Sequence, residues 1–138
     1  MESDIEIRDA LLSAKVIACV GASAKEVRPS HYVSLYLMEQ GKRVIGVNPG
    51  LAGQKLFGEP VYANLKDIPE DIDFIDVFRR SDLVLPMVKD ALESLPALRT
   101  IWMQLGVQND EAAALARAQG VTVIQNRCPK IEWPRLIG

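Results

Sequence analysis

The sequence predicts an α/β fold in three layers, with a doubly wound parallel sheet of about five strands between helices. Two observations lead to this prediction. Short continuous apolar runs, typical of strands buried on both faces, alternate with segments of helical periodicity. The links between them are short, which favours parallel strand pairing and helices on both faces of the sheet.

The first half of the chain is expected to supply two strands and one helix. An apolar run at residues 15–21 ends at a glycine and predicts the first strand. Helical spacing follows over residues 29–40, and Gly41 is a typical stop signal. Residues 43–47 predict the second strand. The glycine- and proline-containing segment that follows predicts only a short strand or turn near Val61.

The second half continues the alternation of strands and helices. Ser81 or Asp82 opens its first helix, and Asn109 or Asp110 caps its second, which is rich in alanine and ends at Gly120. The expected strands are 73–78, 99–103 and 121–124, and the expected helices are 81–95 and 111–119.

Length and composition set limits on the class of protein. The chain has 138 residues, close to the roughly 150 of an average domain, and contains no repeat or linker, so we expect residues 1–138 to form a single domain. Its 49% hydrophobic and 25% charged residues exclude a disordered chain or a disulfide scaffold. A net charge of −2 argues against a nucleic-acid-binding protein, which needs a basic excess.

The sequence also favours a cytoplasmic protein without a metal centre. The N-terminal segment is acidic and lacks the features of a signal peptide, and no apolar run reaches the length of a membrane span. The two cysteines, Cys19 and Cys128, form neither a CxxC motif nor a zinc-ligand spacing. We therefore expect no membrane or metal partner.

The turn after the first strand is the first candidate ligand contact, because ligands of such sheets bind beyond the carboxyl ends of the strands. A dinucleotide-binding turn would have glycine at positions 23 and 26, which are Ser23 and Glu26 in this chain. The Ser23 hydroxyl and free amides of the turn can still hold a phosphate oxygen. The alternative for Gly21 is a tight strand-to-helix turn without a ligand.

The entrance of the next helix adds a cation. Pro29 and Ser30 fit a helix start, as first-turn proline and cap. Arg28 is not required for capping, so we interpret it as a phosphate partner. His31 is interpreted as a residue of the helix face rather than a catalyst.

The end of the second strand argues against an ordinary NAD site. Such a site places Asp or Glu there to bind the ribose hydroxyls, whereas this strand ends in Val47-Asn48-Pro49. An NADP site would need a basic group there, but Lys42 and Arg43 lie at the wrong end of the strand.

Further polar groups follow the later strands. Arg79 and Arg80 come directly after the third long strand, and guanidinium groups suit phosphate. The alternative is that they are solvated, or that one pairs with Asp76, for which an arginine or hydroxyl partner is expected. The Gln104 amide is interpreted as a hydrogen-bonding group for a base or for a pantetheine-like amide. The alternative is that it bonds to backbone groups of its own turn. Cys128 is interpreted as a packing thiol, although Arg127 or Lys130 would make it reactive by lowering its pKa.

Six segments near the expected strand ends are Gly21-Ala22-Ser23, Arg28-Pro29-Ser30, Val47-Asn48-Pro49, Asp76-Val77-Phe78-Arg79-Arg80, Trp102-Met103-Gln104-Leu105-Gly106 and Asn126-Arg127-Cys128-Pro129-Lys130. Together they resemble the small stand-alone CoA-binding proteins of the YccU type. They are also similar to the CoA-binding domain at the start of the succinyl-CoA synthetase alpha subunit. The resemblance covers residues 10–132, and six ordered motifs are far more specific than one glycine turn.

The resemblance implies a Rossmann-like domain that binds coenzyme A, with the adenine nucleotide across the ends of the first two strands. It implies that Gly21, Ser23 and Arg28 meet phosphate and that Asn48 and Pro49 form the nucleotide wall. The remaining implied cofactor-binding residues are Phe78, Arg79 and Gln104 in the rest of the cleft, with Ala22, Pro29, Ser30, Val47 and Arg80 in the same segments.

The expected function is therefore binding of CoA or an acyl-CoA by a domain without its own catalytic domain, acting as a carrier, sensor or partner subunit. The synthetase uses a histidine of a later domain, and the chain ends before such a domain. The alternative is an NAD(P)-linked or acyl-transfer enzyme that uses Cys128 or His31. A third possibility is an interaction protein with a vestigial cleft. A protein partner or a homo-oligomer is compatible with each of these three functions.

Overall fold

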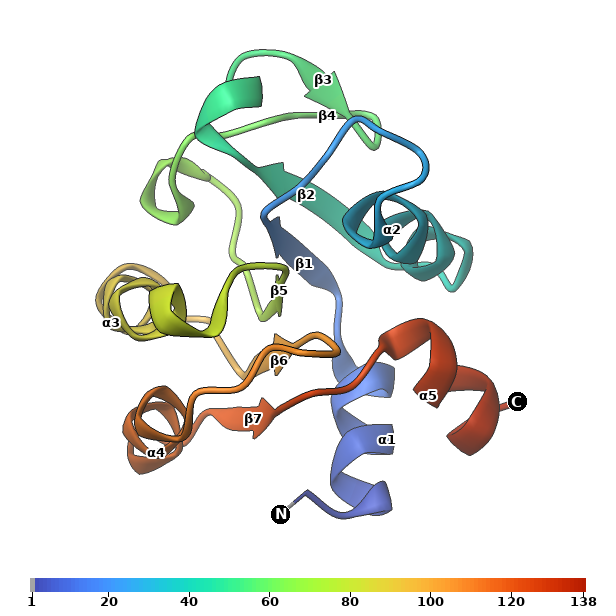
Figure 1. Ribbon diagram of the computed structural model, residues 1–138, viewed down its shortest axis with the longest axis vertical. Coiled ribbons are helices and arrows are strands. Elements are labelled where there is room, and N and C mark those ends of the chain that lie inside the picture. The colour runs from blue at the N-terminus through green and yellow to red at the C-terminus, as the bar shows by residue number, and fades with distance from the viewer. Residues whose placement is uncertain (1) are drawn as a thin grey trace.

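A five-stranded parallel sheet runs through the centre of the molecule, with helices on both faces (Figure 1). The computed structural model describes residues 2–138. The strand order is β2-β1-β5-β6-β7, so the predicted doubly wound sheet is confirmed. The strands of this sheet are β1 (Val16–Val20), β2 (Arg43–Val47), β5 (Phe74–Val77), β6 (Thr100–Met103) and β7 (Thr122–Ile124). The helices are α1 (Asp4–Ser13), α2 (Pro29–Glu39), α3 (Val84–Ser94), α4 (Asp110–Ala118) and α5 (Pro129–Leu136).

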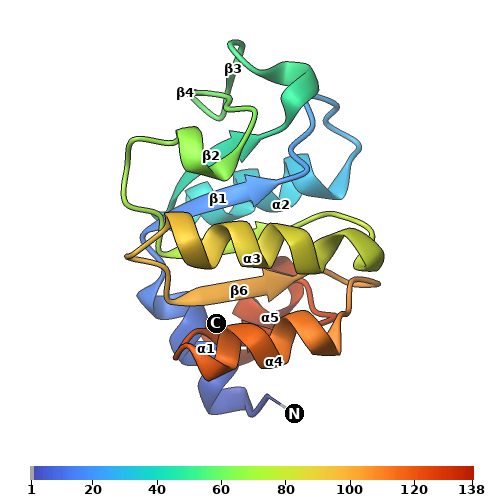
Figure 2. The ribbon, with the colours of Figure 1, turned by 90° about the vertical axis from the view of Figure 1, so that its left-hand side faces the viewer.

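Apolar side chains on both faces of the strands explain why the sheet lies in the middle. All residues of β5 and β6 are buried. Ile75 and Ile101 pack with α3 and α4 on one face, whereas Phe74 and Trp102 pack with α1, α2 and α5 on the other. Figure 2 shows α3 and α4 in front of the sheet. Because burial on both faces removes the need for polar alternation, these strands are continuous apolar runs in the sequence.

The order of the strands reverses next to β1. The chain passes from β1 outward to β2 and then crosses to β5 on the other side of β1. In open parallel sheets, the crevice at such a reversal is the usual ligand-binding position. The carboxyl ends of β1 and β5 therefore mark the place where a site is expected.

The opposite, amino-terminal edge of the sheet is held by Asp73. Its carboxylate accepts hydrogen bonds from the backbone N–H groups of Lys15 and Val16, at distances of 2.8 to 3.2 Å. The Asp73 carbonyl accepts from Arg99 and Thr100. This residue thus ties together the starts of β1, β5 and β6.

Two helices were not expected from the sequence. The hydroxyl of Ser3 caps α1 by accepting from the N–H of Glu6, a pattern with the spacing of a capping box. α5 begins at Pro129, which is favourable in a first turn, and continues through an internal proline. Arg135 joins the two helices through ion pairs with Asp4 and Glu132.

The segment after β2 also contains more structure than expected. A two-stranded hairpin forms from β3 (Lys55–Leu56) and β4 (Glu59–Pro60). The short pairing expected near Val61 is present as a single parallel bridge between Val47 and Tyr62. Among the helices of residues 2–138, none is both long enough and apolar enough to cross a bilayer.

Candidate functional site

The first turn is packed tightly against the end of β5. Gly21 has a φ of +91°, and a Cβ atom at this position would lie 2.3 Å from the carbonyl oxygen of Phe78. The N–H of Gly21 donates to the carbonyl of Val47 at the end of β2. Only glycine fits this combination of backbone conformation and close approach. Gly21 therefore brings the ends of three neighbouring strands together.

Asn48 fixes the other side of the same turn. Its Nδ2 donates to the carbonyl oxygen of Ala22 at 2.8 Å, and its Oδ1 accepts from the N–H of Gly50 at 2.8 Å. An aspartate would set a negative oxygen against the Ala22 carbonyl, so the amide has a structural reason to replace the acid of an NAD site. Both polar groups of the Asn48 side chain are engaged within the protein.

The loop between β1 and α2 presents unused backbone donors. The hydroxyl of Ser23 accepts from the N–H of Lys25, and the carbonyl of Ser23 accepts from Nδ1 of His31 at 2.8 Å. The N–H groups of Ser23, Ala24 and Ser30 donate to no group within residues 2–138. Free amides at a helix N-terminus attract anions. Backbone donors are therefore available at this turn, and the phosphate contact expected there stays a prediction.

Two cavities flank the strand ends, one on each face of the sheet. The first, of about 360 Å³, lies on the α2 side and is lined by Gly21, Asn48 and Phe78, together with Ser23 and Arg28. The second, of about 400 Å³, lies on the α3 side. Its lining includes Val20, Val47, Asn64, Lys66, Arg79, Met87, Asp90 and Glu93. Because consecutive residues of each strand point to opposite faces, the same three strand ends contribute to both cavities.

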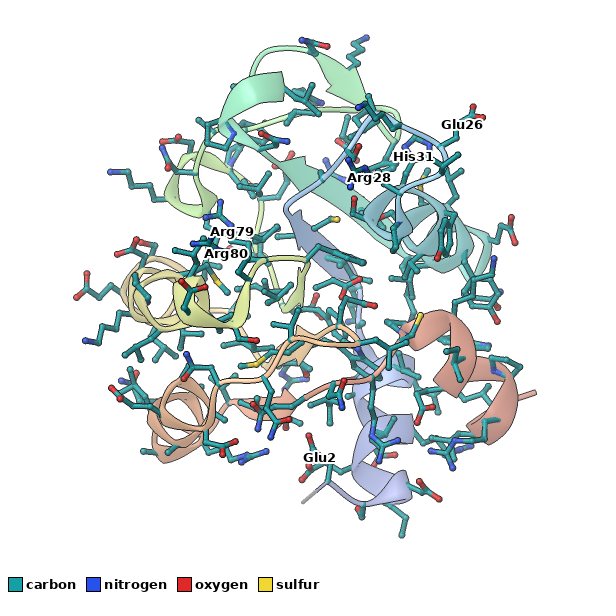
Figure 3. All side chains as sticks on the ribbon, in the orientation of Figure 1. Glu2, Glu26, Arg28, His31, Arg79 and Arg80 are labelled. Atoms are coloured by element: carbon teal, nitrogen blue, oxygen red, sulfur yellow. The ribbon has the colours of Figure 1, made fainter. Side chains whose placement is uncertain are left out.

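The arginines of the edge are distributed between these faces. Arg28 lies on the α2 side, and Arg79 and Arg80 lie on the α3 side (Figure 3). Neither Arg28 nor Arg79 forms an ion pair within residues 2–138, whereas Arg80 pairs with Asp82 and both of those side chains are largely exposed. Glu26 lies at the outer part of the loop, away from the strand ends. Two guanidinium groups therefore remain for an anion, on either side of the first turn.

The residues of the α2 entrance differ in exposure. Ser30 is buried, and its carbonyl accepts from the hydroxyl of Ser34 at 2.6 Å. The N-cap position belongs to Arg28 and Pro29 occupies the first turn, so the expectation that Ser30 caps this helix is wrong. The helix begins one residue before Ser30 because the fixed φ of Pro29 suits the first helical position.

Gln104 is joined to a buried acid. Its Nε2 donates to Oδ1 of Asp76 at 2.6 Å. Burial raises the pKa of Asp76 to about 7, and this hydrogen bond opposes the rise. The expectation of an arginine or hydroxyl partner for Asp76 is wrong. The amide of Gln104 is the partner instead, because β5 and β6 are neighbours. Trp102 lies opposite Asp76 in this pair of strands, and Gln104 follows two residues later on the same face.

The thiols are in environments that do not activate them. Cys128 is 8% exposed, and burial raises its pKa despite the opposing hydrogen bonds from the backbone and the nearby charge of Lys130. Arg127 is engaged with Glu132 at 3.0 Å, and Lys130 lies over the ring of Tyr32. Burial also raises the pKa of Cys19. These observations favour the interpretation of Cys128 as a packing thiol.

The donor set of the site is that of an anion-binding crevice. No cluster of three or more His, Cys, Asp or Glu side chains suited to a metal ion occurs between residues 2 and 138. Arginine forks and backbone amides bind phosphate well. The edge is thus equipped to hold a phosphorylated ligand in a crevice that also offers apolar walls.

Comparison with known sequences identifies the family. The profile of the CoA binding domain matches residues 15–134, a range that contains all five strands of the sheet and the strand ends described above. The chain belongs to the CoA-binding domain family. The resemblance inferred from the six strand-end segments is thereby confirmed, and family membership supports CoA binding.

Individual relatives agree with this membership. The uncharacterised protein YneT of Bacillus subtilis is 35% identical over 129 residues, which cover 94% of this chain and 93% of that protein. A solved structure from Thermus thermophilus, cell-free ID.343, is 38% identical, with a TM-score of 0.91, and the match covers 99% of this chain and 100% of that one. A hypothetical protein from Pyrococcus horikoshii is 34% identical, with a TM-score of 0.89, over 99% and 94% of the two chains.

Sequence reasoning missed two parts of this edge. For Asp76 the sequence predicts an arginine or hydroxyl partner, whereas its bond to Gln104 depends on the order of the strands. The α3-side cavity draws Lys66, Asp90 and Glu93 from a loop and a helix that have no strand-end position. The conspicuous signal in the sequence was the acid inside an apolar run, because a buried carboxyl group needs a donor.

Proposed function

We propose that the protein binds coenzyme A or an acyl-CoA across the carboxyl ends of β2, β1, β5 and β6, and that it acts as a carrier, sensor or partner subunit. The observation that carries the proposal is a pair of guanidinium groups, Arg28 and Arg79, on either side of a turn with unused backbone amides; within residues 2–138 neither guanidinium has an ion pair and these amides have no acceptor. Membership of a CoA-binding family supports it independently.

The diphosphate fits best at the first turn. There the N–H groups of Ser23 and Ala24, the start of α2 and the side chain of Arg28 can all donate to phosphate oxygens. Asn48 would act mainly by holding the turn, because its amide is engaged with Ala22 and Gly50.

The adenine end fits the α3-side cavity. Val20, Val47 and Met87 offer apolar contact to a ring, and the carboxylates of Asp90 and Glu93 are suited to accept from an exocyclic amine. Lys66 and Arg79 line the same cavity and suit the additional ribose phosphate that distinguishes CoA from NAD. This arrangement uses both cavities for one ligand.

A binding role without chemistry fits the two residues that were candidates for catalysis. Nδ1 of His31 is engaged with the Ser23 carbonyl, and its ring packs near Phe57. Cys128 is buried and its pKa is raised, which lowers the fraction of reactive thiolate.

Thermal unfolding in the presence of CoA, acetyl-CoA, NAD and NADP tests the proposal. A ligand at 100 times its Kd stabilises the folded state by about 2.7 kcal/mol, which corresponds to a Tm increase of roughly 10 °C. We expect this shift with a CoA species and not with NAD or NADP. No response to CoA and acetyl-CoA would overturn the proposal, and a response to NAD(P) alone would favour the alternative of an NAD(P)-linked enzyme.

A further inference from the structure

A buried carboxyl group lies directly beneath the carboxyl edge of the sheet. Asp76 of β5 is fully buried, and one of its oxygens accepts from Nε2 of Gln104. The other oxygen, Oδ2, has no hydrogen-bond partner within residues 2–138. An unpaired buried polar atom destabilises a fold, so the presence of this acid points to a role other than stability.

The oxygen of the Gln104 amide accepts no hydrogen bond from the described part of the chain, residues 2–138. No donor of residues 2–138 bonds to Oε1, yet Oε1 is not among the buried polar atoms that lack a partner, so this atom is in contact with solvent. In the observed arrangement, Nε2 and not Oε1 faces the Asp76 carboxyl group. The side chain is otherwise 5% exposed. Gln104 thus keeps one hydrogen-bond acceptor without a partner among residues 2–138.

Gln104 lies on the same face of the sheet as the first turn, beyond the residues that line the α2-side cavity. Asp76, Phe78 and Gln104 alternate with residues of the α3 face and therefore lie on the α2 side, where Ser23 and Arg28 are found. β1 and β6 are separated by β5 alone, so two strand spacings, about 10 Å, separate the first turn from Gln104. Phe78, partly exposed, lies between them.

The chemistry of such an acceptor selects one part of CoA. A neutral carbonyl oxygen accepts from an amide N–H and repels a further phosphate oxygen. Pantetheine supplies amide N–H groups connected to the diphosphate by a short, partly apolar chain, which suits the Phe78 ring. Adenine nucleotides without the arm have no such group at this distance.

We propose that Asp76 is a positioning residue that holds the Gln104 amide with Oε1 toward solvent, where Oε1 accepts a hydrogen bond from an amide N–H of the pantetheine arm. This inference rests on the proposed function. According to this inference, Asp76 and Gln104 together make the protein bind CoA more tightly than the nucleotide that lacks the pantetheine arm.

Calorimetric titration with CoA and with adenosine 3′,5′-bisphosphate, which lacks the pantetheine arm, tests the assignment. The measured quantity is the ratio of the two Kd values, which cancels a general loss of folded protein. We expect Gln104→Met and Asp76→Leu each to reduce the preference for CoA about 5- to 10-fold, the effect of one lost hydrogen bond. Asp76→Asn keeps an acceptor for Nε2 and should restore most of the preference.

Gln119→Ala is the matched control, because Gln119 is an exposed glutamine at the end of α4, just before β7, and so lies at the amino-terminal edge of the sheet, opposite the proposed site. An unchanged ratio in Gln104→Met and Asp76→Leu, with both ligands still bound, would overturn this inference and leave the proposed function intact. Equal loss in Asp76→Asn and Asp76→Leu would also overturn it, since a carboxyl group that acts only through its hydrogen bond is replaceable by an amide. A wild-type protein that binds neither ligand would overturn the proposed function and this inference with it.

Discussion

Replacing Gly21 with alanine tests the packing of the first turn. The backbone at Gly21 has a φ of +91°, a region that costs an L-residue about 1–2 kcal/mol. In addition, the new Cβ would lie 2.3 Å from the Phe78 carbonyl oxygen, so the ends of β1 and β5 must move apart. Such overpacking typically costs about 1–3 kcal/mol. We expect Gly21→Ala to lower the free energy of unfolding by about 2–5 kcal/mol in total.

Gly41→Ala separates the two contributions. Gly41 has a φ of +88°, and a Cβ there would meet no atom within 4 Å. Its replacement should therefore cost only the conformational part, about 1–2 kcal/mol. Urea unfolding of both variants, at an unchanged m value, measures the difference. Equal losses in the two variants would refute the claim that the backbone of Phe78 excludes a side chain at position 21.

Three further predictions follow from charged groups of the sheet. Asp76 has a pKa raised from 3.8 to about 7 by burial. The free energy of unfolding of the wild type should therefore fall by up to about 4 kcal/mol as pH rises from about 4 to above 7. Urea unfolding of Asp76→Asn should lack this decline. The same pH dependence of stability in both proteins would contradict the raised pKa of Asp76. Arg28→Ala and Arg79→Ala should each weaken CoA binding by about 1.5–3 kcal/mol. The free energy of unfolding should not change, since neither arginine has an ion pair within residues 2–138. Arg8→Ala in α1, at an exposed position, is the control variant, and calorimetric affinities equal to that of the parent would exclude Arg28 and Arg79 from the binding site. Asp73→Ala leaves the N–H groups of Lys15 and Val16 without their acceptor and should lower the free energy of unfolding by about 1–3 kcal/mol. The folded variant should bind CoA as tightly as the parent does. A loss of CoA affinity in the folded variant would contradict the placement of the site at the opposite edge of the sheet.

The sheet could be predicted because its signals are local. Each strand is an apolar run that ends at a turn residue, and the alternation with helices restricts the pairing to a parallel sheet. α1 was not predicted although Ser3 and Glu6 have capping-box spacing, because the segment carries exposed apolar residues such as Ile5, which is 74% exposed. α5 was not predicted because a proline in the interior of a segment normally argues against a helix there.

The site was predictable as a set of strand ends but not as a set of contacts. The approach of Gly21 to Phe78 and the bond between Gln104 and Asp76 both depend on which strands are neighbours. The order of strands is decided by crossovers between distant segments, which leave no local pattern. Arg28 and Arg79, both expected at one edge, lie on opposite faces of the sheet because Arg28 stands at the start of α2, whereas Arg79 alternates with Phe78 and faces α3.

The central claim is that CoA binds across the carboxyl edge of the sheet, and amide chemical shifts during a CoA titration test it most directly. In a ¹⁵N-labelled sample, we expect saturable shifts at Gly21, Ser23, Arg79 and Gln104. The cavity of about 710 Å³ at the opposite edge, whose lining includes Gly120, serves as an internal control and should show no shifts. Shifts confined to that edge, or no shifts at CoA concentrations that stabilise the fold, would contradict the account.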